Sequence, residues 1–357
     1  MKIQSYDLHR LHLQLPCPIG DSQVRFTDHW MTLLELKTDE GVVGIGFELQ
    51  QGTPTAGRDE LCAQFEHATW PALHGAHAVG RALHISRPRG GNVGAGVLSL
   101  ATETALWDLT AKAHSLSLFR LLGGTEPRVR AYASTLDFHL GDEEFKVRLG
   151  EFKEMGFSSV KIKVGHPDVD WDLRRMQMAK DVMGDDGDLM VDANEAWSPK
   201  EALLRLHTYQ NAGFEVFWVE DPITREDYDG YAMLTQELPF TRINTGEYLG
   251  FSGKRRLLEC GGVDVLNLHG EINAARAVAH LAGDYGIPVS LGNTLLEIGV
   301  HLAASLPECL YLEFSDLLWN RLARDPVVFD AGYAIAPDRP GHGIEIDRAA
   351  VEEFSRP

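Results

Sequence analysis

The chain has 357 residues, 44% of them hydrophobic and 24% charged, which is enough to bury the core of two domains or of one large α/β barrel with additions. Its net charge of −19 argues against nucleic acid and anionic membranes as partners. Four scattered cysteines, no apolar signal core at the N-terminus and no apolar run of membrane-spanning length predict a reduced, soluble, cytoplasmic protein without a disulfide framework or zinc site.

The first 124 residues have the pattern of an α+β unit. Alternating apolar and polar residues predict an antiparallel meander, with a polar loop around Pro16, Pro18 and Gly20 between its first two strands. Two helical patterns follow, separated by a loop at 87–94. The predicted strands are 3–9, 31–38 and 42–47, and the predicted helices are 57–83 and 97–120.

From Val129 onwards the pattern changes to short apolar strands that alternate with helical segments. The predicted strands are 129–134, 159–164, 188–192, 216–220, 242–245, 263–268, 288–291 and 309–313. Eight strands with such connections predict a (β/α)₈ barrel of the TIM type. We expect a capping domain at 1–124, a barrel at 125–328 and a segment at 329–357 that completes the capping domain, with a strand-like piece at 343–347.

Two lysines interrupt one of the buried strands, in the stretch Val160–Gly165 (VKIKVG). Side chains alternate along a strand, so Lys161 and Lys163 point to the same face, roughly 6–7 Å apart. Burial disfavours their charged forms, and the two ammonium groups repel each other. Such a pair is tolerated only where anions or a function compensate.

Acidic residues follow three successive strands, about one β/α unit apart. They are Asp192, Glu220 and Glu247. The carboxyl ends of barrel strands meet at one mouth, so the three carboxylates can converge there. Oxygen ligands of this kind suit Mg²⁺ or Mn²⁺, whereas zinc would favour Cys or His. Each acid alone also fits a helix cap or a solvated turn, and it is their common spacing that favours a metal site.

These stretches together resemble the mandelate racemase/muconate lactonizing enzyme branch of the enolase superfamily. The matching motifs are VKIKVG at 160–165, VDANEAW at 191–197, WVEDP at 218–222 and TGE at 245–247. The resemblance covers essentially the whole chain and implies a TIM-like barrel with an N-terminal cap. A glutamate at position 247 resembles the mandelate racemase subgroup more than the muconate lactonizing one.

The resemblance also implies roles for these residues. Asp192, Glu220 and Glu247 would ligate Mg²⁺, which stabilises the enediolate formed when a proton α to a carboxylate leaves. Lys163 would be the general acid/base, and Lys161 would hold the substrate carboxylate. Asn194 would lie near the metal and Glu313 near the substrate carboxylate. The family further suggests a homo-oligomer.

The chain departs from the family pattern on the opposite face of the substrate. The mandelate racemase pattern has an Asp after strand six and a His after strand seven, and here these positions hold His269 and Gly292. Our hypothesis is that His269 itself faces Lys163 and acts as acid or base. The alternative is a structural histidine that supports Glu247.

Substrate specificity should come from the N-terminal unit. We expect the segments 17–29 and 48–55 to close over the barrel mouth, with Arg25, His29 and Gln50 as candidate contacts. A cation at Arg25 would suit a polar or second-carboxylate substrate. The alternative is an arginine that only meets solvent.

Three hypotheses for the function remain. The first is dehydration of an acid sugar, which abstracts the α-proton and eliminates the β-hydroxyl. The second is racemisation or epimerisation of a hydroxy or amino carboxylate through two bases. The third is a non-catalytic barrel that binds a metal or ligand. A Schiff-base aldolase fits less well, because it needs one buried lysine and no carboxylate triad.

Overall fold

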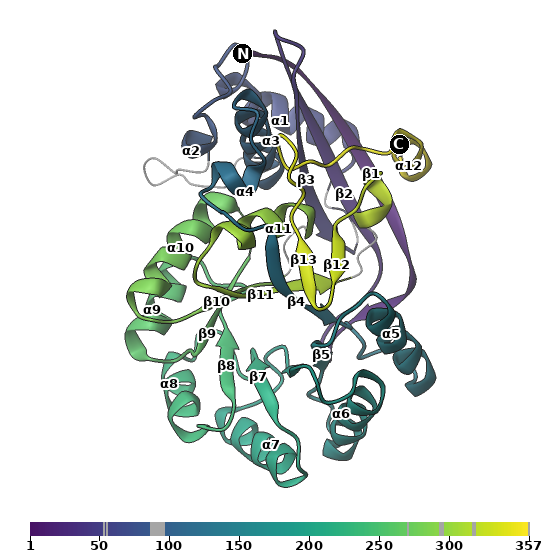
Figure 1. Ribbon diagram of the computed structural model, residues 1–357, viewed down its shortest axis with the longest axis vertical. Coiled ribbons are helices and arrows are strands. Elements are labelled where there is room, and N and C mark those ends of the chain that lie inside the picture. Colours follow the sequence, from purple (N-terminus) through teal and green to yellow (C-terminus); the bar gives the residue numbers. More distant parts are fainter. Residues whose placement is uncertain are drawn as a thin grey trace.

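The computed structural model describes residues 1–52, 54, 56–85, 97–269, 271–292, 296–315 and 319–355. The expected loop at 87–94 lies outside these residues. A capping domain sits above a barrel, and the C-terminal segment runs back from the barrel to the cap (Figure 1). None of the described helices is long and apolar enough to cross a membrane.

The capping domain is built on an antiparallel sheet of order β1-β2-β3, formed by β1 (Ile3–Gly20), β2 (Arg25–Thr38) and β3 (Val43–Gln51). Helix α3 (Ser99–Ala113) packs closely on β3, because Gly44 and Gly46 have no side chain in the way. A Cβ on Gly46 would lie 1.8 Å from the carbonyl oxygen of Ala101. These glycines therefore set the distance between helix and sheet.

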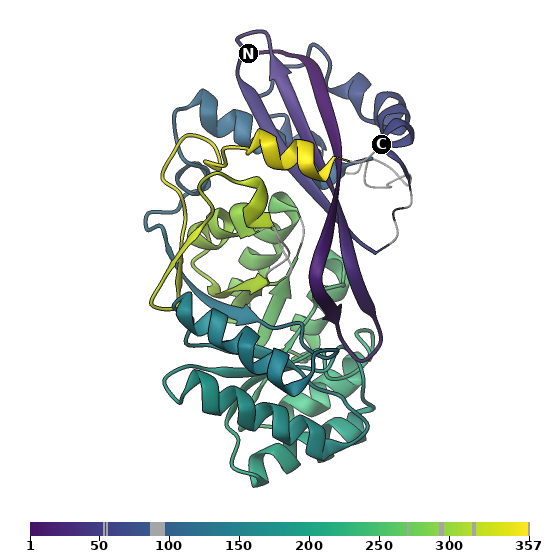
Figure 2. The ribbon, with the colours of Figure 1, turned by 90° about the vertical axis from the view of Figure 1, so that its right-hand side faces the viewer.

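The first two strands run much further than expected. The polar loop predicted between them is wrong, since only 21–24 form the turn. A register shift between Gln14 and Ile19 accommodates Pro16 and Pro18, which have no N–H to donate to a ladder. The resulting hairpin reaches down from the cap to the barrel (Figure 2).

The two long helices expected in this domain are broken into shorter ones. The region 57–83 contains α1 (Arg58–Ala68), a 3₁₀ turn at Trp70–Ala72 and α2, which begins at Ala82 and ends at Ile85. Gly75 and Gly80 have positive φ and interrupt the helical pattern. In the second region α3 is followed by α4 (Leu118–Leu121), and Ser115 with φ of 54° separates them.

The predicted (β/α)₈ barrel is confirmed. Eight parallel strands close on themselves, since the last of them, β11, pairs with the first, β4. The strands are β4 (Arg128–Ser134), β5 (Val160–Lys163), β6 (Leu189–Asp192), β7 (Val216–Glu220), β8 (Arg242–Thr245), β9 (Val265–Leu268), β10 (Val289–Leu291) and β11 (Cys309–Ser315). The helices around them are α5 (Asp142–Glu154), α6 (Val169–Met183), α7 (Pro199–Asn211), α8 (Tyr228–Glu237), α9 (Phe251–Cys260), α10 (Ile272–Asp284) and α11 (Leu296–Ser305).

The C-terminal segment contacts both domains. After a 3₁₀ turn at Trp319–Leu322, strands β12 (Val328–Asp330) and β13 (Tyr333–Ile335) form a hairpin that pairs with β4. Helix α12 (Arg348–Phe354) then packs against β1. The strand expected at 343–347 is not formed, because only Ile346 makes an isolated bridge, to Ala323. The exact division at 124 and 328 stays a prediction.

Candidate active site

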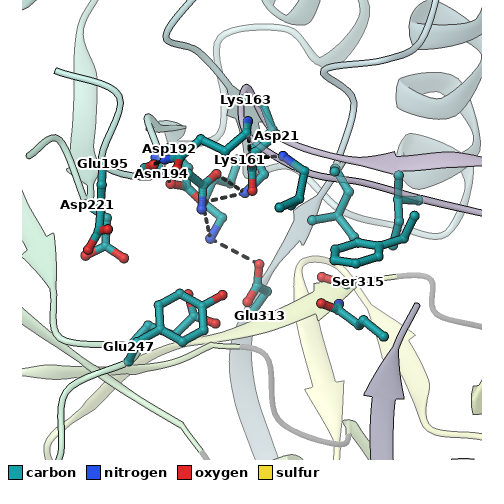
Figure 3. Close-up of a pocket in the computed structure, with 18 of the residues that line it drawn as sticks. Asp21, Lys161, Lys163, Asp192, Asn194, Glu195, Asp221, Glu247, Glu313 and Ser315 are labelled. Carbon is teal, nitrogen blue, oxygen red and sulfur yellow. Dashed lines mark hydrogen bonds and ion pairs between the residues drawn. The ribbon is translucent and has the colours of Figure 1, made fainter. Parts of the chain in front are cut away.

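A cavity of about 290 Å³ lies at the carboxyl ends of the barrel strands, under the tip of the β1–β2 hairpin. Lys161 and Lys163 form one wall of it, and Glu247 lies on the opposite side (Figure 3). Because alternate residues of β5 point inward, both ammonium groups enter the barrel mouth. Lys161, Lys163, Asp192 and Glu247 therefore meet in one cavity.

The two lysines are buried, and carboxylates compensate their charge. Lys161 Nζ lies 2.5 Å from Glu220 Oε1, 3.1 Å from Glu313 Oε1 and 3.5 Å from Asp192 Oδ2. Lys163 Nζ donates to Asp192 Oδ2 at 2.6 Å and to Asn194 Oδ1 at 2.7 Å. Burial alone would lower the pKa of each lysine, but these acidic neighbours outweigh it and raise the pKa of both.

The three acids have different electrostatic environments. Burial opposes the charge on Asp192, but Lys163 and Lys161 outweigh it and hold the pKa below its ordinary value. Burial raises the pKa of Glu220 despite the nearby Lys161. Burial, together with Asp221 and Glu313, raises the pKa of Glu247 to about 7. The site therefore accumulates negative charge that a further cation would relieve.

The donor set fits a hard divalent cation. Glu220 Oε2 is buried and has no hydrogen-bond partner among the described residues. As these side chains stand, no three described Asp, Glu, His or Cys residues converge tightly enough to hold an ion. The lysine ammonium groups contact the oxygens of Asp192 and Glu220. A cation would have to displace these contacts, and oxygen ligands of this kind suit Mg²⁺.

The loops after β6 and β7 have strained backbones at the cavity. Asn194, Glu195 and Asp221 are non-glycine residues with φ of 45°, 63° and 38°. The Asn194 N–H donates to Asp192 Oδ1 at 2.9 Å, and Thr245 Oγ1 donates to Asp221 Oδ1 at 2.6 Å. Backbone strain of this kind persists only where the surroundings fix it, and it gathers at functional sites.

A buried network braces β5 from behind, and the sequence analysis missed it. Asp137 accepts the Lys163 backbone N–H at 2.9 Å and Arg175 Nη2 at 3.2 Å. Arg175 is itself completely buried, with its guanidinium 4.0 Å from the Phe145 ring centroid. No local motif marks this pair, because Asp137 and Arg175 come from separate segments that only the fold brings together.

The hairpin lines the cavity, but through other residues than expected. Arg25, His29 and Gln50 are not among the described lining residues, whereas Val24, Phe26 and Gln51 are. Arg25 is exposed, His29 is buried in the sheet, and Gln50 accepts a hydrogen bond from Arg10 at 2.6 Å. Described residues of both segments do line the cavity, but side chains alternate along a strand, so a shift of one residue changes the face.

The tip of the hairpin also contacts the loop that follows β6. Gln23 Nε2 donates to the Asn194 carbonyl oxygen, and His139 Nε2 lies 2.9 Å from the Val24 carbonyl oxygen. Asp21 lines the cavity as well. The position of Asn194 is thus tied both to the cap and to Lys163.

His269 lies beside this cavity and not in its described lining. It borders a neighbouring cavity of about 390 Å³, which shares Glu247 with the first and also contains Lys254. Desolvation, and then the Lys254 ammonium, lower the pKa of His269, and its ring centroid is 6.3 Å from that of Tyr248. The hypothesis that His269 faces Lys163 directly gains no support from this placement.

Gly292 is closely surrounded, which explains why no histidine stands there. A Cβ at this position would lie 2.7 Å from Asn267 Oδ1 and 3.2 Å from Glu313 Oε2. Asn267 is completely buried, and its side-chain amide has no partner among the described residues. Asn267 of β9 therefore fills the space beside Gly292 with its side-chain amide.

Two family models match the chain. Residues 144–350 match the model described as enolase C-terminal domain-like, and residues 11–123 match the N-terminal domain of mandelate racemase/muconate lactonizing enzyme. The first alone covers more than half of the chain.

Curated relatives and solved structures agree with these matches. The chain is 29% identical to D-galactarolactone cycloisomerase from Agrobacterium fabrum, with all of both chains covered, and 26% identical to L-talarate/galactarate dehydratase from Salmonella typhimurium, over 98% of this chain and 90% of that protein. A mandelate racemase-like protein from Mesorhizobium loti superposes with a TM-score of 0.94 at 42% identity, covering 100% of this chain and 95% of that one. L-talarate dehydratase from Polaromonas sp. JS666, solved with Mg and L-glucarate, superposes with a TM-score of 0.86 at 29% identity over 100% and 98%. The chain belongs to the mandelate racemase/muconate lactonizing enzyme branch of the enolase superfamily and is one of its enzymes.

Proposed function

We propose that this protein removes the proton α to the carboxylate of an acid sugar and then eliminates the β-hydroxyl, as a dehydratase. The observation that carries this proposal is the cavity that two buried lysines line together with Asp192 and Glu247, with the buried Glu220 paired to Lys161 beside it. Relatives named as dehydratases of arabinonate, of talarate and galactarate, and of xylonate support this reaction class.

Asp192, Glu220 and Glu247 would hold Mg²⁺, with Mn²⁺ as an alternative that the same oxygen donors accept. Bound there, the ion would supply a positive charge that stabilises the enediolate. Lys161, fixed among three carboxylates, would orient the substrate carboxylate. Lys163 Nζ would take the α-proton. Burial and the Lys161 charge oppose the charged form of Lys163, but Asp192 outweighs them and raises its pKa, so Lys163 would act as a base once Asp192 is engaged by the ion.

The departing hydroxyl needs a proton, and His269 is retained as the candidate donor. Its placement beside Glu247 lets it act only if the substrate reaches across from the Lys163 side. Asn194 and Glu313 would line the end of the cavity where the reacting carboxylate binds, since they contact Lys163 and Lys161. We keep cytoplasmic localisation and a homo-oligomer as predictions.

Epimerisation is the second candidate. It shares the first half-reaction, and two relatives are named L-Ala-D/L-Glu epimerases. It requires a second base on the face opposite Lys163, and the residues that stand at the strand ends in question are His269, outside the described cavity lining, and Gly292, which has no side chain. This observation favours the dehydratase.

A deuterium exchange experiment tests the proposal. The protein with Mg²⁺ is incubated in D₂O with a library of aldonic and aldaric acids, and NMR follows the α-proton and the appearance of a 2-keto-3-deoxy product. We expect exchange and product with the wild type, and neither after chelation or in Lys163→Ala. Exchange with inversion and no loss of water would favour the epimerase. No exchange with any acid would favour a non-catalytic barrel.

A further inference from the structure

Arg225 lines the active-site cavity in a fixed orientation. It follows β7, and Glu195 holds it by two parallel hydrogen bonds, from Nε to Oε1 at 2.5 Å and from Nη2 to Oε2 at 3.0 Å. Its backbone N–H donates to Glu195 Oε1 as well, at 2.9 Å. The guanidinium also lies over the Tyr248 ring, 4.6 Å from its centroid. An arginine clamped on one edge and one face has little freedom left to lose when it binds a ligand.

One edge of this guanidinium remains available. Among the described residues, Glu195 is the only hydrogen-bond partner of the Arg225 side chain, and Nη1 donates to none of them. The side chain is 37% exposed and borders the cavity, so ligands can reach it. A planar guanidinium with free N–H groups is well suited to a carboxylate.

The backbone around the arginine's partner is strained. Glu195 adopts φ of 63°, directly after Asn194 with φ of 45°, and its N–H donates to the Asp221 carbonyl oxygen at 2.6 Å. This turn places Asn194 beside Lys163 and Glu195 beside Arg225. A single rigid turn therefore sets the position of the arginine relative to the catalytic lysine.

Among the described residues that line the cavity, Arg225 is the one cation that is not placed at the reacting end. The cations of this described lining are Lys161, Lys163 and Arg225. The two lysines are engaged at the end where the reacting carboxylate would bind. The cation that the sequence analysis assigned to a second carboxylate, Arg25, is not part of the lining.

We propose that Arg225 binds the carboxylate at the far end of a dicarboxylic acid sugar, so that the enzyme prefers aldarates to aldonates. This inference rests on the proposed function, because it assumes that the near carboxylate lies at Lys161. Tyr248 would then shield the Arg225–carboxylate pair on one face, as it already covers the guanidinium.

Steady-state kinetics with matched substrates tests the inference. Galactarate and glucarate are compared with galactonate and gluconate, which have a terminal hydroxymethyl group in place of the second carboxylate. We expect Arg225→Gln to lower kcat/KM for the aldarates about 10- to 100-fold, mainly through KM, because a hydrogen-bonded charge pair is lost. The aldonates should change about twofold or less, and Arg225→Lys should fall between wild type and Arg225→Gln.

The control is Arg255→Gln, which removes an exposed arginine paired to Glu259 at 2.8 Å on α9. It should leave both substrate classes unchanged. Equal losses for aldarates and aldonates in Arg225→Gln would make the arginine a structural residue and overturn the inference. So would a wild type that prefers aldonates.

Failure of the proposed function would look different, because the wild type would then exchange no α-proton of any acid. In that case calorimetric titration with galactarate and galactonate in the presence of Mg²⁺ still decides about Arg225. Tighter binding of galactarate that is lost in Arg225→Gln supports the inference. Equal binding of the two acids, or no effect of the substitution, contradicts it.

Discussion

The two lysines of β5 lie two residues apart, yet their partners differ. Lys161 contacts Glu220, Glu313 and Asp192, whereas Lys163 contacts Asp192 and the amide of Asn194. Lys161 therefore stays charged in almost any state of the site. Lys163 depends on Asp192, and it loses most of its compensation once that carboxylate is engaged elsewhere. This asymmetry supports a binding role for the first lysine and an acid/base role for the second.

The role of His269 can be separated from that of Lys163. If His269 donates the proton to the leaving hydroxyl, His269→Asn should keep α-proton exchange, because Lys163 is intact, while product formation falls about 10²- to 10⁴-fold. NMR in D₂O measures both quantities in one sample. Mg²⁺ affinity should be unchanged, which controls for damage at Glu247. Product formation near the wild-type rate would leave His269 only a structural role.

Magnesium binding should depend on pH through Glu247. Burial, followed by Asp221 and Glu313, raises the pKa of this carboxyl to about 7, so below pH 7 the metal-free protein holds a proton there. A cation must displace that proton, so its affinity should fall as the pH drops below 7, by about tenfold for each pH unit and each proton displaced. Titration calorimetry at about pH 5.5 to 8.5 measures the affinity. Repeating it in buffers with different heats of ionisation gives the number of protons released. An affinity independent of pH would contradict a protonated Glu247 in the metal-free site.

The residues of the site differ in how far the sequence predicts them. Asp192, Glu220 and Glu247 follow strands at a common spacing, and the period of two places both lysines on one face. Arg225, Tyr248 and Gln23 carry no such pattern, since they reach the cavity from loops and from a hairpin tip. Their positions depend on backbone turns such as the left-handed Asn194–Glu195 pair, which propensities do not reveal.

At the scale of elements, the β1–β2 hairpin determines what closes the cavity. The sequence predicted a loop there because of two prolines and a glycine, but cross-strand pairing carries both strands to Gly20 and Arg25. Strand pairs are stabilised by neighbours on the adjacent strand, so local composition is a weak guide to where a hairpin turns. The barrel strands were easier to predict, because their buried apolar runs alternate with helices.

The hairpin tip should affect catalysis through Asn194. Gln23 donates to the Asn194 carbonyl, and the Asn194 side chain accepts from Lys163. We expect Gln23→Ala to lower kcat about 2- to 10-fold, because losing one hydrogen bond of about 0.5–1.5 kcal/mol loosens both the hairpin tip and the position of Lys163. The exposed neighbour variant Arg25→Ala should change kcat little. The reverse ranking of the two variants would show that the tip acts by charge and not by holding Asn194.

At the scale of the whole molecule, the C-terminal segment fastens the cap to the barrel. The completely buried Asp108 on α3 accepts the His342 N–H at 3.0 Å, the Ile45 N–H at 2.9 Å and Lys112 Nζ at 2.6 Å. His301 on α11 reaches the His342 carbonyl oxygen, with Nε2 at 2.8 Å. The return to the cap was expected from the sequence, but the Asp108–His342 hydrogen bond joins residues 234 positions apart, and no sequence pattern marks it.

Removing the Asp108 carboxylate, which we call the latch, should lower the free energy of unfolding of the whole chain. Asp108→Ala leaves Lys112 without its buried partner and two backbone N–H groups without an acceptor, which should cost about 3–5 kcal/mol of the free energy of unfolding. Because the latch joins the domains, we expect calorimetry to show a lower Tm and a separate, earlier transition for the cap. The matched control is Asp338→Ala, because Asp338 also lies on the C-terminal segment and forms a half-exposed ion pair with Arg120 of α4. This substitution should lower the free energy of unfolding by about 1 kcal/mol or less. Equal effects of the two variants would mean that the segment holds the cap by its surface contacts. A large effect of Asp108→Ala alone would identify the buried carboxylate as the group that connects the capping domain to the barrel through the C-terminal segment.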